Sequence, residues 1–288
     1  MSDKHGVKGG IEYDAIRTKM QTGPFRLNIY DYRTTTDAPP ETVFYYFHGQ
    51  GGDESSYERA MLFLHEYIRD KAPSSVVVSF SAGPEAMLIP KNSAQSSGLV
   101  AAFINDVLMK LDQTHHFSAS KKILIGTSMG GTSLSYVFFN HPQYFHGAVI
   151  ISAGHYPFSV FAKDVELEKF IKENETFTLR EQLGRLVGVT PRLKGIKSVL
   201  SVQKRFFGSE SDWENVFIFN TMKKADKRQP VYISIGKWDS LGLYRGNLML
   251  SQKAKAAGYD VTYDEINGGH GAFDKSRVIQ FVASLLEK

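Results

Sequence analysis

The sequence predicts an α/β protein with a mainly parallel central sheet. Short runs rich in β-branched and aromatic residues alternate along the chain with stretches whose length and apolar spacing suit helices. This alternation is typical of parallel strands joined by right-handed crossover helices, which pack on both faces of the sheet. Six strands are expected at residues 42–47, 76–80, 121–125, 148–152, 231–235 and 261–266.

An earlier strand and five helices complete the expected core. Residues 25–32 alternate apolar and polar side chains, with Phe25, Leu27 and Ile29 on one face, and we expect this strand at an antiparallel edge of the sheet. The helices are expected at residues 55–70, 98–111, 132–140, 248–257 and 277–287.

Residues 155–228 interrupt this alternation, with helical patterns near 165–172 and 179–186 but no clear strand. The segment carries many apolar rings: Phe158, Phe161, Phe170, Phe177, Phe206, Phe207, Trp213, Phe217 and Phe219. A solvated loop would carry fewer, so some should face the core domain, although they could also serve only to hold the insertion together. We therefore expect a core of residues 1–154 and 229–288, with 155–228 as a mainly helical cap over a ligand pocket.

The composition is that of a globular chain and excludes several kinds of site. With 288 residues, 42% of them hydrophobic, the chain can form one domain with a full core and a substantial insertion. Its 34 basic and 30 acidic residues give a net charge of +4, and the basic residues are scattered, which argues against a nucleic-acid partner. There is no cysteine, which excludes disulfides, thiolate metal sites and a cysteine nucleophile.

The chain shows no membrane or secretion signal. No apolar run approaches the ~18 residues of a membrane span, and the first residues lack the apolar core of a signal peptide. The densest basic stretch, residues 223–228, is interpreted as a solvated surface segment. We therefore expect a cytoplasmic protein without a membrane span.

The motif Gly126-Thr127-Ser128-Met129-Gly130 indicates a nucleophilic serine. It directly follows the apolar run 123–125 and precedes a stretch that can open a helix. A strand, a sharp turn and a helix are what a nucleophile elbow requires, and small residues at the first and last positions let the strained turn pass its neighbours. Ser128 would then stand at the apex of the turn.

A serine hydroxyl is a poor nucleophile at neutral pH and needs a base. Loops that follow the carboxyl ends of parallel strands converge, so the base should follow a later strand. His270 does so, within Asn267-Gly268-Gly269-His270-Gly271, where the glycines suit a loop with an unusual backbone path. His155, just after the strand ending near residue 152, is the alternative histidine.

An acid should orient that base. Asp239 follows the strand at 231–235 by a short turn, so it lies at the same end of the sheet as the predicted serine and histidine. Asp260 and Asp264 are less suitable, because one lies at the start of the last strand and the other inside it. Asp239 is therefore the predicted acid.

The glycine-rich loop His48-Gly49-Gln50-Gly51-Gly52 directly follows an apolar strand. Free backbone N–H groups in such a loop can stabilise an oxyanion. Gln50 is the first choice and Gly51 the second, and Met129, the residue after the nucleophile, should supply the other donor. The loop lacks the pattern of a phosphate cradle, and His48 is expected to brace it.

Together, the order Ser128, Asp239, His270 and the upstream H-G-x-G-G loop resemble the α/β-hydrolase superfamily, over residues 25–154 and 230–288. The elbow and the histidine loop are similar to those of bacterial carboxylesterases of the esterase D and feruloyl esterase groups. The expected activity is hydrolysis of a small-molecule carboxylic ester, without a metal or other cofactor. An acyltransferase, thioesterase or peptidase could use the same three residues, and a noncatalytic ligand sensor could share the fold. The sequence indicates neither the acyl and alcohol specificity nor an oligomeric state.

Overall fold

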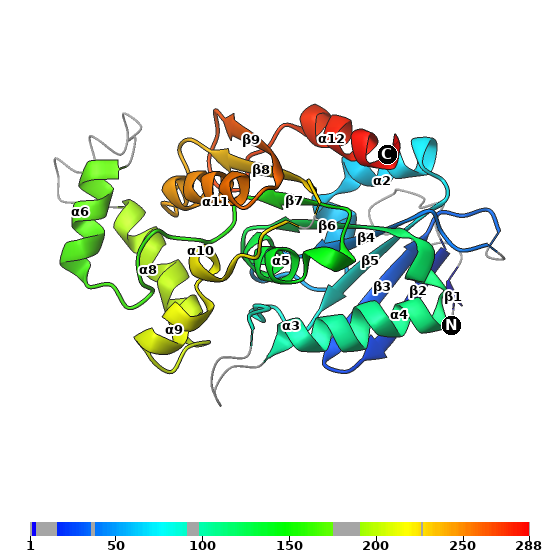
Figure 1. Cartoon of the computed structure of the whole chain (residues 1–288), viewed down its shortest axis with the longest axis horizontal. Coiled ribbons are helices and arrows are strands. Elements are labelled where there is room, and N and C mark those ends of the chain that lie inside the picture. The colour runs from blue at the N-terminus through cyan, green and yellow to red at the C-terminus, as the bar shows by residue number, and fades with distance from the viewer. Residues whose placement is uncertain are drawn as a thin grey trace.

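The computed structural model describes residues 2–3, 16–35, 38–90, 98–174, 191–225 and 227–287. They form a nine-stranded sheet in the order β1-β2-β3-β5-β4-β6-β7-β8-β9, with helices packed around it (Figure 1). The strands are β1 (Ser2–Asp3), β2 (Ile16–Thr22), β3 (Phe25–Asp31), β4 (Thr42–Phe47), β5 (Ser75–Ser81), β6 (Lys121–Thr127), β7 (Gly147–Ile151), β8 (Pro230–Gly236) and β9 (Asp260–Ile266).

The six expected parallel strands are confirmed as β4 to β9. Every neighbouring pair from β5 to β9 along the sheet is parallel. β4 is buried along its whole length, and its side chains alternate between two cores: Val43 and Tyr45 face one, Phe44 and Tyr46 the other. Burial on both faces explains why this strand reads as a continuous apolar run.

The antiparallel pairing expected for residues 25–32 is confirmed, but their expected place at the edge is wrong. β3 pairs antiparallel with both β5 and β2, and β1 lies outside β2. The sequence of β2 is Ile-Arg-Thr-Lys-Met-Gln-Thr, and its residues 18–21 are all at least partly exposed. A strand with so little apolar alternation has no hydrophobic signal, so its presence could not be predicted.

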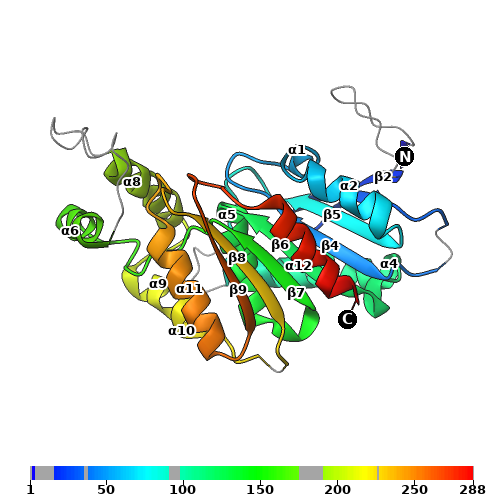
Figure 2. The ribbon, with the colours of Figure 1, turned by 90° about the horizontal axis from the view of Figure 1, so that it is seen from above.

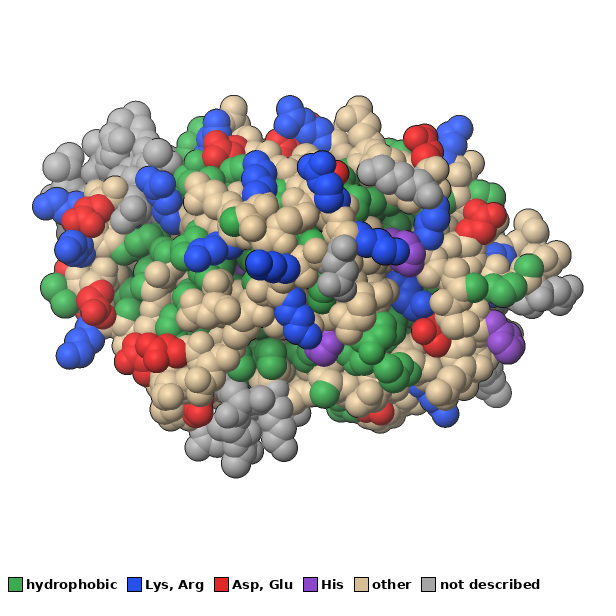
Figure 3. All heavy atoms as spheres, viewed as in Figure 1, with side chains coloured by type: hydrophobic (Ala, Val, Ile, Leu, Met, Phe, Trp, Pro, Cys, Tyr) green, Lys and Arg blue, Asp and Glu red, His purple; other side chains and the backbone are tan. Residues whose placement is uncertain are grey.

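Helices cover both faces of the sheet (Figure 2). One face carries α1 (Ser56–Ala60), α2 (Leu62–Lys71) and α12 (Lys275–Glu287). The other carries α3 (Leu99–Ala102), a π-helix over Phe103–Met109, α4 (Lys110–Thr114), α5 (Met129–Asn140) and α11 (Tyr244–Ala256). In the described ranges, no helix combines the length and the apolarity needed to cross a membrane. On the face drawn in Figure 3, Lys and Arg side chains are spread across the surface.

The insertion forms four helices in its described part and no strand there. They are α6 (Asp164–Asn174), α8 (Pro191–Lys204), α9 (Glu210–Val216) and α10 (Ile218–Thr221), gathered at one end of the molecule beside α11 (Figures 1 and 2). The helix expected near 165–172 corresponds to α6, whereas residues 179–186 and Phe177 lie outside the described residues. The division into a core and a cap stays a prediction.

We expect Phe103→Ala to lower the free energy of unfolding by about 3–5 kcal/mol. Phe103 has no exposed surface and packs against the rings of Phe25, Tyr45, Phe47 and Phe80 at centroid distances of 4.9–6.4 Å. Urea unfolding followed by fluorescence measures the loss. Val165→Ala is the control, because Val165 is 70% exposed and should change stability by less than about 0.5 kcal/mol. Equal stability of the two variants would contradict this account of the core.

Candidate active site

The candidate site lies where the strand order reverses. The chain runs from β4 to β5 on one side, then returns to place β6 on the other side of β4. The loops after β4 and β6 therefore leave the sheet side by side, and in open α/β sheets such a switch point is where ligands bind. These two loops contain His48-Gly49-Gln50-Gly51-Gly52 and Ser128.

Ser128 sits at a strained turn between β6 and α5. Its backbone has φ 54° and ψ −120°, and its N–H donates to the carbonyl of Ile151 at 2.8 Å. A Cβ atom on Gly126 would lie 2.7 Å from the carbonyl oxygen of Gly130, and one on Gly130 would lie 2.1 Å from that of Phe47. Only glycine fits at both positions, which is the physical reason for the motif.

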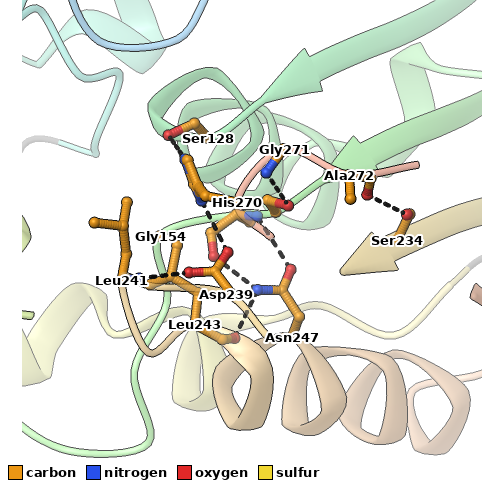
Figure 4. A network of polar contacts seen from close by, with 12 residues as sticks. Ser128, Gly154, Ser234, Asp239, Leu241, Leu243, Asn247, His270, Gly271 and Ala272 are labelled. Atoms are coloured by element: carbon orange, nitrogen blue, oxygen red, sulfur yellow. Dashed lines mark hydrogen bonds and ion pairs between the residues drawn. The ribbon is translucent and has the colours of Figure 1, made fainter. Parts of the chain in front are cut away.

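Three polar side chains from separate elements meet at this turn (Figure 4). His270 Nε2 lies 2.9 Å from Ser128 Oγ, and His270 Nδ1 lies 2.8 Å from Asp239 Oδ2. The carboxylate can only accept, so Nδ1 carries the hydrogen in the neutral ring and Nε2 accepts the hydroxyl hydrogen of Ser128. This chain of hydrogen bonds can move a proton from the serine to the imidazole and stabilise the resulting cation.

Asp239 is fully buried, and its second oxygen, Oδ1, accepts the N–H of Leu241 at 2.8 Å. A buried carboxylate is tolerable only when its oxygens are hydrogen-bonded, and both oxygens of Asp239 are. The imidazole of His270, in contrast, keeps 27% of its surface exposed. The acid is thus shielded from water while the base remains accessible.

The loops after β8 and β9 contact each other, which brings Asp239 to His270. The N–H of Trp238 donates to Gly268 at 3.0 Å, and the N–H of Asp239 donates to Gly236 at 3.1 Å. A Cβ on Gly236 would lie 2.1 Å from the carbonyl oxygen of Gly269. Glycine at position 236 therefore lets the histidine loop approach the end of β8.

The glycine-rich loop after β4 lies against the serine. A Cβ on Gly49 would be 3.6 Å from the Cβ of Ser128, so the two backbones are neighbours. Within this loop, the N–H of Gly51 donates to the carbonyl of Pro84 at 2.7 Å. The Gly51 amide is therefore engaged elsewhere, and of the two predicted loop donors Gln50 is retained.

Met129 is the first residue of α5. An N–H in the first turn of a helix has no carbonyl one turn earlier to receive its hydrogen bond, so this amide suits an anion beside Ser128. Met129 directly follows the serine at the start of α5, and Gln50 follows Gly49, whose backbone lies beside the serine. Their role as oxyanion donors remains a prediction.

His48 links the loops after β4 and β5. Its Nδ1 lies 2.8 Å from the carbonyl oxygen of Gly49, which can only accept, so Nε2 accepts the hydroxyl hydrogen of Ser81 at 2.9 Å. Ser81 Oγ in turn accepts the N–H of Gly83 at 3.0 Å. Burial lowers the pKa of His48, which favours the neutral ring that this arrangement needs. These contacts are those of a bracing residue.

The alternative candidates lie apart from the three central residues. His155 is buried between the rings of Tyr136 and Phe219, at 5.8 and 5.9 Å. Asp264 accepts the hydroxyl of Tyr232 at 2.7 Å and pairs with Arg277, and Asp260 is exposed at the start of β9. Over the described ranges, no three His, Asp or Glu side chains gather as a metal site would require.

Sequence reasoning did not single out three polar residues around the site, Ser152, Thr132 and Asn247. Ser152 directly follows β7, Thr132 lies in the first turn of α5, and Asn247 lies in α11. Their only sequence signal was position, since each is close to the carboxyl end of a parallel strand or in the helix after it. Short polar residues at such places are too common to identify a site.

We expect Gly130→Ala to destabilise the protein by about 1–3 kcal/mol, because the added methyl group would overlap the carbonyl of Phe47. Backbone atoms on both sides of this contact leave little room for relaxation. The matched control is Gly49→Ala, whose added atom would keep contacts of 3.5 Å or more and should be tolerated. Urea unfolding of both variants checks this, and a Gly130→Ala variant as stable as Gly49→Ala would show the elbow to be less tightly packed.

Stability should fall in acid partly because of His155. Burial lowers its pKa to about 3, whereas in the unfolded chain it protonates near about 6.5. Between these values the unfolded state binds the proton and the folded state does not, so unfolding becomes easier by up to about 1.4 kcal/mol per pH unit as pH falls. His155→Phe should flatten this dependence, measured by urea unfolding at about pH 7 and pH 5. An unchanged slope would mean that other groups carry it.

Comparison with known proteins identifies the fold. No family model matches the chain, and no curated protein matches it in sequence. Among solved structures it resembles the Pyrococcus furiosus esterase Pf2001 (TM-score 0.56, 13% identity, 95% of this chain and 93% of that one). It also resembles a carboxylesterase from Mesorhizobium loti (0.54, 12%, 93% and 98%) and Est1E from Butyrivibrio proteoclasticus (0.55, 12%, 94% and 99%). The protein thus has the α/β-hydrolase fold.

Proposed function

We propose that the protein is a serine hydrolase that cleaves carboxylic esters through an acyl-enzyme on Ser128. The observation that carries the proposal is the pair of hydrogen bonds that joins Ser128 Oγ to His270 Nε2 at 2.9 Å and His270 Nδ1 to Asp239 Oδ2 at 2.8 Å. Nucleophile, base and orienting acid are thereby in the order that acyl transfer requires. The similar structures named above are esterases and carboxylesterases, which supports an ester as the substrate.

The reaction would proceed in two halves. In the first, His270 takes the proton of Ser128 as Oγ bonds to the ester carbonyl carbon, and then gives that proton to the departing alcohol oxygen when the C–O bond breaks. In the second, His270 takes a proton from water as the water oxygen attacks the acyl-enzyme, and returns it to Ser128 as the acid leaves. Asp239 stays ionised throughout and stabilises the imidazolium.

The N–H groups of Gln50 and Met129 would bind the oxyanion of each tetrahedral intermediate. Met129 directly follows Ser128 at the start of α5, Gln50 belongs to the loop after β4, and the Gly51 amide donates to Pro84 instead. One such donor contributes about 3 kcal/mol to transition-state stabilisation, so the conformation of the loop after β4 matters for the rate.

We assign residues 155–228 the role of a cap that limits access to Ser128. Three contacts join this segment to the loops around the site: Tyr156 Oη donates to the carbonyl of Leu241 at 2.7 Å, Gln203 donates to the carbonyl of Gly154, and Arg205 pairs with Glu85. In addition, α8 packs closely on the Asp239 loop, since a Cβ on Gly195 would lie 2.5 Å from the carbonyl oxygen of Ser240. Size and shape of the substrate would therefore be set by the insertion.

Hydrolysis of p-nitrophenyl esters of increasing acyl length tests the proposal. Ser128→Ala should lower kcat by about 10⁴-fold or more, and Asp239→Asn by about 10⁴-fold, because the histidine then loses the partner that fixes its tautomer. Asp260→Asn is the matched control and should keep wild-type turnover, since Asp260 is exposed at the start of β9.

Two further measurements separate the alternatives. A fluorophosphonate should modify wild-type protein at Ser128, as shown by mass spectrometry of the labelled peptide. A second alcohol in the assay separates hydrolysis from acyl transfer by its products. Unchanged turnover in Ser128→Ala, or no labelling of the wild type, would refute the proposal, and the latter result would favour a ligand sensor.

A further inference from the structure

The tripeptide Ser152-Ala153-Gly154 directly follows β7, and Figure 4 shows Gly154 close to the proposed catalytic residues. It is hydrogen-bonded to the loop after His270, to the helix that begins with the elbow, and to α11, the helix that follows Asp239. All three of its residues are buried. None of them takes part in the reaction as proposed above.

Ser152 holds the histidine loop. Its Oγ accepts the N–H of Gly271, the residue after His270, at 3.1 Å, and its own N–H donates to the carbonyl of Ser234 at 2.8 Å. Ser234 contacts the same loop one residue further along the chain, since its hydroxyl donates to the carbonyl of Ala272 at 3.2 Å. Two buried serines at the ends of neighbouring parallel strands thus fix the backbone immediately after the histidine.

The backbone of Ser152 is strained. Its φ is 49°, in the left-handed region that favours glycine, and among the described residues only two others that are not glycine share this feature, His116 and Ser128. Such a conformation costs of order 1 kcal/mol or more for a residue with a side chain. Glycine at 152 would relieve this strain, but it would remove the hydroxyl that receives the Gly271 N–H. The hydrogen bond from the Gly271 N–H to the Ser152 hydroxyl therefore offsets the free energy of the strained backbone at Ser152.

Gly154 connects the tripeptide to the nucleophile. Its N–H donates to Thr132 Oγ1 at 2.7 Å, and the same hydroxyl donates to the carbonyl of Ser128 at 3.2 Å. The hydroxyl thus accepts one hydrogen bond and donates another, which fixes its orientation. In this way the backbone after β7 and the backbone of the elbow share one side chain.

Ala153 connects the tripeptide to the acid side of the site. Asn247, which is fully buried in α11, accepts the Ala153 N–H at 3.1 Å and donates to the Ala153 carbonyl at 2.8 Å. It also donates to the carbonyl of Leu243 at 2.9 Å. Both backbone groups of Ala153 are therefore satisfied by one amide on the helix that follows the Asp239 loop.

We infer that Ser152 is a positioning residue, whose hydroxyl holds the His270 loop so that the imidazole reaches Ser128 and Asp239 together. The inference rests on the proposed function, because it assigns a role in setting the geometry of that reaction. Proton transfer depends steeply on the Ser128–His270 geometry, and a misplacement of about 1 Å can cost about 100-fold in rate. Ser152 touches neither substrate nor reacting atoms in this role.

The variants Ser152→Ala and Ser152→Gly test this inference as a pair. Both remove the hydroxyl, but only glycine also relieves the positive φ, so Ser152→Gly should be at least as stable as Ser152→Ala. Ser79→Ala is the matched control, because Ser79 in β5 is equally buried and belongs to none of these loops. All rates are normalised to the active sites titrated by a fluorophosphonate, which removes any loss from misfolding.

Both Ser152 variants should lose about 10- to 100-fold in kcat with little change in KM, and their Ser128 should react more slowly with the fluorophosphonate. The far-downfield NMR signal of the His270 Nδ1–H bonded to Asp239, assigned by its absence in His270→Asn, should broaden or shift in them and remain in Ser79→Ala. A merely structural role would lower stability without moving either readout.

Turnover per active site and labelling rate within about twofold of wild type in both variants, with an unchanged imidazole signal, would overturn the inference while the proposed function stands. Failure of the proposed function has a different signature, because Ser128 of the wild type would then not react at all. In that case the imidazole signal still decides whether Ser152 places His270.

Discussion

The contact between Gly130 and the carbonyl of Phe47 is the constraint on which the site depends. It brings the first turn of α5 against the end of β4 so closely that no side chain fits between them. The elbow at Ser128 and the glycine-rich loop after β4 are thereby forced together, although 75 or more residues separate them along the chain. Parallel pairing of β4 with β6 aligns the two strand ends, and the glycine allows the final approach.

Near this contact, the acid Asp239 and the base His270 have different environments. Asp239 is buried and hydrogen-bonded through both oxygens. His270 stays partly exposed between the buried Asp239 and the partly exposed Ser128. The hydrogen bonds that hold the carboxylate come from the backbone N–H of Leu241 and the imidazole of His270. Hydrogen bonds between loops that are far apart along the chain, such as that from the Gly271 N–H to Ser152, order this region.

The sequence predicted the parallel core well because its signals are strong there. Strands β4 to β8 are largely buried runs rich in β-branched and aromatic residues, β9 is more exposed, and the bounds of all six were predicted to within two residues. The three residues that meet at the site were also predicted, because strand ends, glycines and chain order restrict where such groups can lie. The elements that were not predicted lack such signals. β2 is polar and partly exposed, and α8 to α10 lie in a segment where strands and helices do not alternate. The engagement of the Gly51 amide and the strain at Ser152 depend on backbone angles, which residue types do not reveal.

The loop after β5 has a consequence for how the protein responds to salt. Pro84 holds the Gly51 amide at 2.7 Å, and its neighbour Glu85 pairs with Arg205 of the insertion. The first link is a short neutral hydrogen bond that ions do not screen. The second joins side chains that are 50% and 58% exposed, contributes at most about 1 kcal/mol, and weakens as ionic strength rises. Raising the salt concentration therefore weakens the Glu85–Arg205 contact with the insertion, whereas the hydrogen bond between Gly51 and Pro84, near the nucleophile, is retained.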